Sequence, residues 1–364
     1  MKIERLSLHN FKNYNELNLQ FDHRINLFYG LNGSGKTNLL DAIYFLSISK
    51  SYFTSSDHFI TRHNQDFYRT QGHFKNEEIA ITVCVKKRQS DKKTIEVQGK
   101  KLKTASELIG KIPIVLVAPD DIRIVKQGSK ERRDFINRMI CMSHRPYLSE
   151  LITHNRVLAQ KNALLKATGS IDFDLLDHYN EQLIRLGSSI CENRSALVIQ
   201  YKDYVRRTYS QISDGAEEVD IKYQSQFQSQ DIEQQFKDVQ SDEIRTRRIQ
   251  IGIHKDDFEF TINNQPLKKI GSQGQIKSFV YALRIGEYMY LKDHLSEKPI
   301  LMLDDYFEKL DAKRLELLTR FLKDDTFDQV FLSDTELERT SALLTKFEIP
   351  FSAYQIQNGE ILKQ

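Results

Sequence analysis

The sequence is short of the features that mark secreted and membrane proteins. Its three cysteines, Cys84, Cys141 and Cys191, lie far apart and form neither a CxxC pair nor a cluster with histidine, so neither a disulfide framework nor a zinc site is indicated. No run of residues approaches the roughly 20 apolar positions of a membrane span, and the opening MKIERLSL is charged where a signal peptide is apolar. We therefore expect a cytoplasmic protein that is not attached to a membrane.

An excess of charge is also lacking. Lys and Arg number 53 against 50 Asp and Glu, which gives a net charge of only +3, and so balanced a composition does not indicate nucleic-acid binding by itself. The 364 residues, of which 40% are hydrophobic, are enough to bury a sizeable core in two domains, or in one domain with a large insertion.

The hydrophobic pattern divides the chain into three parts. Alternating residues at 3–8 and 14–19 predict half-buried strands, and the apolar run 24–29 predicts a buried one. From about residue 129 to 209 apolar residues recur at helical spacing, and strand patterns return near 219 and 258. We predict an α/β fold with an inserted, mainly helical second lobe: an ATPase lobe from 1–112 and 251–364, and the inserted lobe from 113–250.

The strongest motif is a complete G-x-x-x-x-G-K-[ST] segment between a buried strand and an amphipathic helix. In such a P-loop, backbone N–H groups surround phosphate oxygens, the lysine neutralises the β- and γ-phosphates, and the hydroxyl residue binds Mg²⁺. A chance glycine-rich turn is the alternative. The predicted nucleotide-binding residues are Gly30, Leu31, Asn32, Gly33, Ser34, Gly35, Lys36 and Thr37.

A second carboxylate for the metal follows the apolar run Pro299–Leu303. Asp304 ends this run, and we predict that it holds Mg²⁺ together with Thr37. Asp305 is placed to polarise the attacking water, and its side chain is one methylene shorter than a glutamate, which suggests slow hydrolysis of ATP. The alternative is that Asp305 only places a negative charge at a helix N-terminus.

A serine-containing segment, Gly271-Ser272-Gln273-Gly274-Gln275, opens a predicted helix between these two motifs. A serine hydroxyl and backbone N–H groups at a helix N-terminus form an anion site, so Ser272 and Gln275 are predicted to contact the nucleotide. An ordinary helix cap is the alternative.

Six ordered segments of the chain resemble the RecF family, bacterial recombination mediators of the ABC/SMC-like ATPase group. The resemblance spans the whole chain. Asp311 lies seven residues beyond Asp304, where ABC-type ATPases keep an aspartate, and is predicted to contact the nucleotide. The segments are IERLSLHNFKNY, YGLNGSGKTNLLDAIYFLS, APDDIRIVKQGSKERRDFIN, GIHKDDFEF, GSQGQ and PILMLDDYFEKLD.

The resemblance implies an ABC-type P-loop ATPase head without a long coiled coil. It also implies an ATP-dependent homodimer that binds double-stranded and gapped DNA, hydrolyses ATP slowly, and works with RecR and RecO proteins to load recombinase in DNA repair and replication restart. The predicted catalytic residues are Lys36, Ser272, Asp304 and Asp305. Where family members have a threonine run near the C-terminal end, this chain has Phe331-Leu332-Ser333-Asp334-Thr335, so the residue that senses the γ-phosphate is not assigned.

Two basic segments are candidates for contact with DNA phosphates. The segment 86–111 has nine lysines and arginines against three acids, and such charges can meet phosphates without reading bases. A solvated hairpin is the alternative. The second candidate comprises Lys130, Arg132, Arg133 and Arg138.

Two other functions remain open at this point. An ABC transporter ATPase would have a shorter insertion between its P-loop and its serine-containing segment, and would dock a membrane partner. A nucleotide switch that acts only on protein partners would not bind DNA. DNA binding that depends on both salt and ATP would separate the first prediction from these two.

Overall fold

The computed structural model describes residues 1–76, 78–88, 91–229, 231–305, 312–323 and 325–363. Its internal contacts divide the chain into two compact units, and each is described by itself below. The first unit comprises Met1–Asp121, Gln211–Asp214 and Lys277–Gln364, and the second comprises Ile122–Ser210 and Gly215–Ile276.

The first unit contains a mainly parallel six-stranded sheet in the order β15-β14-β3-β13-β12-β8. The five parallel strands are β3 (Ile25–Tyr29), β8 (Ile114–Val117), β12 (Ile300–Leu303), β13 (Val330–Asp334) and β14 (Phe351–Gln357), and β15 (Glu360–Lys363) is antiparallel. Strands β8, β12 and β13 are buried along their whole length, as is usual for parallel strands covered on both faces.

A second, antiparallel sheet of the same unit has the order β2-β1-β4-β5-β6-β7. Its strands are β1 (Lys2–Phe11), β2 (Tyr14–Gln20), β4 (Phe67–Lys75), β5 (Ala80–Arg88), β6 (Thr94–Val97) and β7 (Lys100–Lys101). Buried positions alternate with partly or fully exposed ones along β4, as expected for strands with one face on the core.

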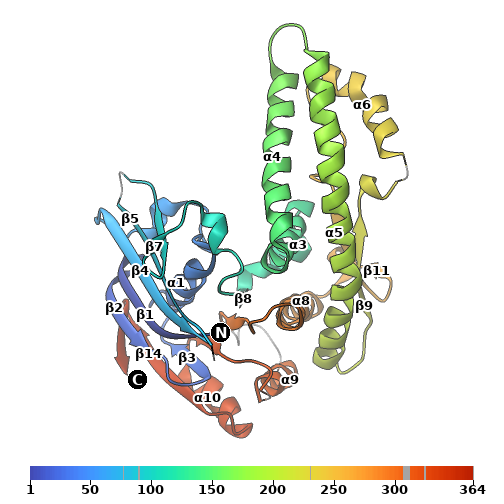
Figure 1. Cartoon of the computed structure of the whole chain (residues 1–364). Coiled ribbons are helices and arrows are strands. Elements are labelled where there is room, and N and C mark those ends of the chain that lie inside the picture. The colour runs from blue at the N-terminus through green and yellow to red at the C-terminus, as the bar shows by residue number, and fades with distance from the viewer. Residues whose placement is uncertain (77, 89–90, 230, 306–311, 324, 364) are drawn as a thin grey trace. The chain divides into compact units, whose positions relative to one another are not determined.

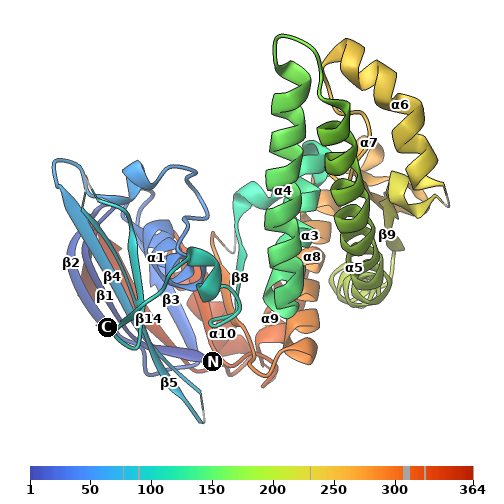
Figure 2. The same cartoon turned by 45° about the horizontal axis from the view of Figure 1, so that its top comes forward.

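Helix α1 (Lys36–Ile48) contributes to the core that the two sheets share (Figures 1 and 2). Its side chains Leu39, Leu40, Ile43 and Phe45 are completely buried in the same cluster as residues of both sheets. The helix starts at Lys36, so packing of its apolar residues fixes the position of the loop just before it.

The remaining helices of the first unit surround these sheets. Helix α8 (Gln273–His294) starts in the second unit and continues in the first. The others are α9 (Ala312–Lys323), α10 (Leu337–Lys346) and the short 3₁₀ helices η1 (Asp57–Ile60), η2 (Ala105–Leu108) and η3 (Pro119–Asp121).

The second unit is mainly helical, with α4 and α5 side by side as a hairpin (Figures 1 and 2). The Ser189 hydroxyl donates to Glu150 across this hairpin at 2.7 Å. The helices are α2 (Ile122–Lys126), α3 (Ser129–Ser143), α4 (Arg145–Lys166), α5 (Phe173–Ser213), η4 (Gln226–Gln228), α6 (Ile232–Thr246) and α7 (Leu267–Ile270). A small sheet has the order β11-β10-β9, formed by β9 (Val219–Gln224), β10 (Asp257–Ile262) and β11 (Gln265–Pro266).

The predicted boundaries after residues 112 and 250 differ from the observed ones, because two strands belong to the other unit than expected. Residues 114–117 were expected in the inserted lobe, but they form β8, which pairs with β12 in the first unit. Residues 257–262 were expected in the ATPase lobe, but they form β10, which pairs with β9 in the second unit. Pairing between distant strands sets these boundaries, and no local pattern reveals it.

Two findings concern the helices as a group. Among the described residues no helix is longer than the 41 residues of α5. None of the helices in the described ranges is long and apolar enough to cross a membrane.

Candidate nucleotide-binding site

The predicted P-loop lies between β3 and α1, at the carboxyl end of the parallel strands. Glycine is required at two of its positions: Gly30 has φ +150°, and a Cβ there would lie 2.2 Å from the backbone oxygen of Ile356. Gly35 has φ +122°, and its Cβ would lie 2.5 Å from the Nδ2 atom of Asn13. The loop therefore keeps its shape because only glycine fits against the structure behind it.

Groups from β1–β2 and from the C-terminal strands hold the carbonyl side of the loop. Asn13 Nδ2 and the Gly359 amide both donate to the carbonyl of Ser34, at 3.1 and 2.9 Å, and the Tyr14 hydroxyl donates to the carbonyl of Gly35 at 2.9 Å. The buried hydroxyl of Ser34 has no hydrogen-bond partner within the described ranges. Carbonyls tied back in this way and an unpartnered hydroxyl fit a loop that is completed by a bound anion.

Lys36 is folded back onto the same loop. Its ammonium group donates to the carbonyls of Gly30 and Leu31 at 2.7 and 3.1 Å, and only 4% of the residue is exposed. Leu31 itself is 81% exposed, and Asn32 and Gly33 are exposed as well. The cation predicted for the β- and γ-phosphates is thus already in the P-loop.

Thr37 and Asp304 come together from opposite ends of the chain. The Thr37 hydroxyl lies 3.1 Å from each carboxylate oxygen of Asp304. Thr37 is in the first turn of α1, after β3, and Asp304 directly follows β12; strand β13 lies between β3 and β12 in the sheet. The hydroxyl and the carboxylate are the hard oxygen donors that Mg²⁺ prefers, so these two residues fit the predicted metal site.

Ser333 organises both aspartates at the end of β12. Its hydroxyl donates to Asp304 Oδ1 at 2.7 Å and accepts a hydrogen bond from the backbone N–H of Asp305 at 2.8 Å. Asp305 has a left-handed backbone with φ +46°, a conformation that aspartate tolerates better than most residues. Ser333 is completely buried at the end of β13, so it fixes the two carboxylates relative to each other.

The site is electrostatically tuned by burial. Burial raises the pKa of the Asp304 carboxyl to about 6, whereas hydrogen bonds from Ser333 and Thr37 act in the opposite direction. The charge of Asp305 adds to the increase. Burial lowers the pKa of the Lys36 ammonium, while the nearby carboxylates oppose that shift. A carboxyl and an ammonium group with pKa values shifted in this way are typical of a site that binds charged ligands.

The sequence pattern assigns no role to two residues beside the predicted site. Ser333 and Asp334 were noted only as a departure from a family pattern, yet both are at most 6% exposed and belong to the site. Asp334 accepts from the Thr335 amide at 2.7 Å and the Thr340 hydroxyl at 2.5 Å. Ser333 and Asp334 could have been predicted from the sequence, because two polar residues follow an apolar run, which is the same pattern that identified Asp304.

The serine-containing segment belongs to the second unit, not to the unit that holds the P-loop. Ser272 is exposed and precedes α8. The Ser272 hydroxyl accepts a hydrogen bond from the backbone N–H of Gln275 at 3.2 Å. The backbone N–H of Ser272 donates to the side-chain oxygen Oε1 of Gln275 at 2.7 Å. The ordinary cap that was weighed as an alternative is therefore present. Asp311 lies outside the described residues.

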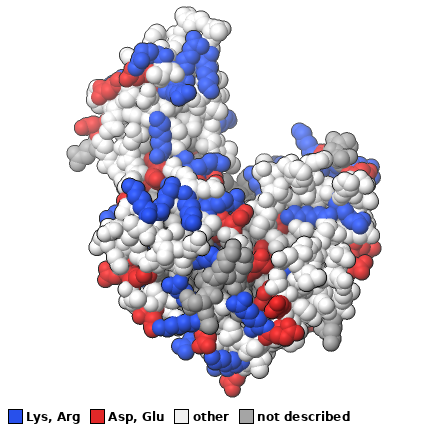
Figure 3. Space-filling view, turned by 180° about the vertical axis from the view of Figure 1, so that it is seen from behind, with Lys and Arg blue, Asp and Glu red and all other residues white. Residues whose placement is uncertain are grey.

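The predicted DNA contacts divide into exposed and internal groups. Lys92, Lys100 and Lys101 are exposed. Lys93 instead pairs with Asp57 at 2.9 Å, donates to a backbone carbonyl and lies over an aromatic ring. On the face shown in Figure 3 basic and acidic side chains occur together, so surface charge alone does not identify an interface.

Two of the four residues of the second basic candidate are used inside the protein, whereas Lys130 is exposed. Arg132 is 7% exposed and pairs with Asp257 at 2.7 Å, while Arg133 donates to the carbonyl of Asp256 at 2.7 Å. Both arginines already donate to oxygens of the second unit, so they have fewer donors left to reach phosphates.

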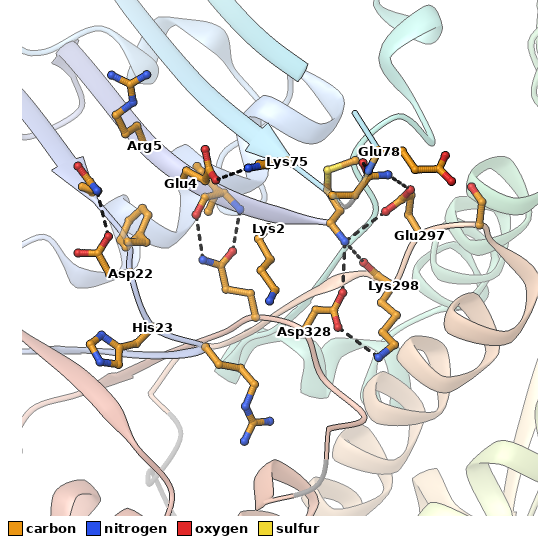
Figure 4. A pocket seen from close by; sticks show the side chains of 18 residues that line it. Lys2, Glu4, Arg5, Asp22, His23, Lys75, Glu78, Glu297, Lys298 and Asp328 are labelled. Atoms are coloured by element: carbon orange, nitrogen blue, oxygen red, sulfur yellow. Dashed lines mark hydrogen bonds and ion pairs between the residues drawn. The ribbon is translucent and has the colours of Figure 1, made fainter. Parts of the chain in front are cut away.

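A cavity of about 1090 Å³ lies at the other end of the parallel strands (Figure 4). It is lined by residues that precede β3, β12 and β13, among them Arg24, Lys298 and Asp328, and the last two form an ion pair at 3.2 Å. None of the predicted site residues that the structure describes lines it. Ligands of open α/β sheets bind beyond the carboxyl ends of the strands, so the P-loop end remains the candidate site.

Comparison with known proteins agrees with this geometry. The family model described as "RecF/RecN/SMC N terminal domain" matches residues 2–347. Crystal structures of SMC head domains share the fold, with a TM-score of 0.58 at 14% identity. The fold and the P-loop geometry therefore define an ABC/SMC-type P-loop ATPase head with an inserted helical lobe.

Individual relatives narrow this class. The "DNA replication and repair protein RecF" of Cytophaga hutchinsonii is 37% identical and is aligned over 99% of this chain and 96% of its own length. That of Bacteroides fragilis is 35% identical over 99% and 98%. A structure titled "recombination mediator protein RecF-ATP in RecFOR pathway" has a TM-score of 0.89 at 26% identity and covers 100% of this chain and 97% of its own. The chain belongs to the RecF family.

Proposed function

We propose that this protein is an ATP-gated, DNA-binding recombination mediator. It binds Mg-ATP at the P-loop, dimerises around two nucleotides, hydrolyses ATP slowly, and binds double-stranded DNA and its junctions with single strands. With RecR and RecO proteins it helps to load recombinase in repair and replication restart. The observation that supports the proposal is the contact of Thr37 with both oxygens of Asp304, two oxygen donors of the kind that Mg²⁺ prefers, beside a complete P-loop motif.

Each of these residues has a distinct role in the proposed binding and hydrolysis of ATP. Thr37 and Asp304 would hold Mg²⁺, which neutralises phosphate charge when it is bound. Lys36 exchanges its loop carbonyls for the β- and γ-phosphates, and backbone N–H groups of the P-loop bind the remaining oxygens. Asp305 orients the attacking water. Its short side chain supports slow hydrolysis.

The site is composite in this proposal. Each P-loop faces Ser272 and Gln275 from a second copy across a two-fold axis, and Asp311 contributes to the same interface. An isologous arrangement of this kind buries two identical nucleotide sites. Binding of ATP then controls association of the copies, and association controls binding of DNA.

A DNA-binding titration with and without ATP tests the main claim. Affinity for a labelled duplex should rise with ATP, fall as salt increases, and lose its ATP dependence in Lys36→Ala. Binding to protein partners alone, with no ATP-dependent DNA binding, would favour the nucleotide switch that acts only on proteins.

A mixing experiment tests the composite site. Ser272→Arg places a bulky cation where the γ-phosphate of the other copy belongs, and Lys36→Ala disables the P-loop. With either variant alone, the subunits should fail to associate when ATP is added. Random mixing places both lesions in one site of the heterodimer, so roughly one quarter of all sites should be restored. A site built within one chain predicts no rescue.

A further inference from the structure

The side chain of Gln275 is held at both of its polar atoms. Its Nε2 donates to Glu217 Oε1 at 2.5 Å, and its Oε1 accepts the backbone N–H of Ser272 at 2.7 Å. An amide side chain can be turned over so that its oxygen and nitrogen change places. Turned over here, Gln275 would set its NH₂ against the N–H of Ser272 and its oxygen against a carboxylate. Glu217, which only accepts, therefore fixes the amide in one orientation.

Glu217 is itself fixed from two directions. The hydroxyl of Tyr209, a completely buried side chain of α5, donates to Glu217 Oε2 at 2.6 Å. The next residue, Glu218, exchanges hydrogen bonds with Asn263: its backbone N–H donates to Oδ1 at 3.0 Å, and its carbonyl accepts from the Asn263 N–H at 2.8 Å. The carboxylate is thus tied to α5 through Tyr209, and the backbone of the next residue is tied to the turn after β10.

The helix cap does not depend on this carboxylate. The Gln275 amide N–H donates to Ser272 Oγ at 3.2 Å, and the Ile276 amide donates to the Ser272 carbonyl at 3.0 Å. Both bonds are made by backbone donors and remain when Glu217 is removed. Loss of Glu217 should therefore free the amide of Gln275 and the N–H of Ser272 while α8 keeps its first turn.

We propose that Glu217 is a positioning residue for the serine-containing segment. Through Gln275 it holds the Ser272 turn in the shape that contacts a phosphate of the nucleotide bound to the P-loop of the second copy. This inference rests on the proposed function. Neither the P-loop motif nor the serine-containing motif includes Glu217, and the carboxylate acts on the nucleotide only through Gln275.

Removal of the carboxylate gives the first test. Glu217→Ala should raise the ATP concentration needed for subunit association about tenfold, the usual consequence of losing one hydrogen bond to a charged group. Binding of ATP to the isolated monomer should not change. Glu217→Gln should restore most of the association because its carbonyl still accepts from Gln275. Tyr209→Phe should weaken association in the same direction by a smaller factor.

The matched control is Glu218→Ala, which removes the neighbouring exposed carboxylate. It should associate as the unmodified protein does. Thermal unfolding of all variants separates a local effect from loss of the fold: Glu217→Gln, which keeps an acceptor for Tyr209, should keep the transition midpoint of the control, and Glu217→Ala should still unfold cooperatively above the temperature of the assay. Association of Glu217→Ala at the normal ATP concentration would overturn the inference.

Mixing decides which half of the composite site is damaged. Glu217→Ala should regain association when mixed with Lys36→Ala, because the lesions meet in one site and leave the other intact. It should not regain association with Ser272→Arg, because both lesions affect the serine-containing half. A general loss of stability would not give this pattern.

The outcomes also separate the inference from the function on which it rests. If Ser272→Arg is rescued by Lys36→Ala but Glu217→Ala is not, the role of Glu217 is wrong and the composite site stands. If neither pair is rescued, the composite site itself is wrong, and the role of Glu217 is overturned with it.

Discussion

The hydroxyl of Thr37 lies 3.1 Å from both carboxylate oxygens of Asp304, although 267 positions separate the two residues in the sequence. The contact joins the first turn of α1 to the end of β12. It also places a carboxyl that is only 4% exposed beside the P-loop. The cost of burying this group gives a prediction that needs no nucleotide.

Asp304→Asn should stabilise the ligand-free protein at neutral pH. Burial raises the pKa of Asp304 to about 6 in the folded protein, against about 3.9 in an unfolded chain. Ionisation of this group therefore costs stability, and the cost grows as pH rises from about 4 to about 6. The variant should gain about 2–3 kcal/mol in free energy of unfolding at pH 8, and little near pH 4.

Denaturant unfolding between about pH 4.5 and 8, without Mg²⁺ or nucleotide, measures this difference. The exposed Asp66 offers a control, since Asp66→Asn should change stability little at either end of the range. A gain for Asp304→Asn that is the same at all pH values would contradict the assignment of the cost to ionisation.

Ser333→Ala should damage the fold and the site together. It removes the donor to Asp304 and leaves the Asp305 N–H without its acceptor, so we expect a loss of about 1–3 kcal/mol in free energy of unfolding and slower turnover of ATP. Ser333→Thr keeps the hydroxyl and suits a strand, and should retain most activity. Equal turnover in Ser333→Ala and the unmodified protein would show that Ser333 does not position the aspartates.

Asp305→Asn should separate binding from hydrolysis. The change keeps the size of the side chain and removes the charge that would orient the attacking water, so ATP-dependent association should persist while turnover falls by about tenfold to a thousandfold. Single-turnover measurement of bound ATP isolates the chemical step. Hydrolysis at the normal rate would mean that Asp305 has only a structural role.

Much of the nucleotide site could be predicted because each part has a local pattern. Gly30–Thr37 needs glycines at fixed positions, and Asp304 ends an apolar strand, so both are visible in a short stretch of sequence. Ser333 was not assigned a role, because its importance comes from strand β13 lying between β3 and β12. That order depends on pairing between segments that are far apart in the chain, which no local pattern contains.

The same reasoning explains the domain boundaries. The helical periodicity of the insertion is visible in the sequence, but β8 joins the parallel sheet and β10 joins the small sheet of the second unit.

The charge of a segment likewise does not show which of its residues are free to bind a partner. Lys93 reads as one more basic residue in a run, and only the fold shows that Asp57 neutralises it at 2.9 Å.

That distinction sharpens the test of DNA binding by the segment 86–111. Reversal of the exposed Lys92, Lys100 and Lys101 to glutamate should weaken DNA binding across sequences. It should also flatten the dependence of log affinity on log salt by about 2–3, since each phosphate that a lysine neutralises adds roughly 0.9 to that slope. Lys93 is left intact because its removal would disturb the fold. Affinity for ATP should be unchanged, since none of these residues belongs to the P-loop.

A triple reversal of exposed lysines in the second unit is the matched control, because it changes the net charge by the same amount. Lys166, Lys237 and Lys255 serve this purpose. If both triple variants lose affinity equally and with the same salt dependence, the effect reflects net charge, and the segment 86–111 is only a solvated hairpin. A loss confined to the first variant assigns DNA binding to this edge of the antiparallel sheet, because general electrostatic attraction would respond to both reversals alike.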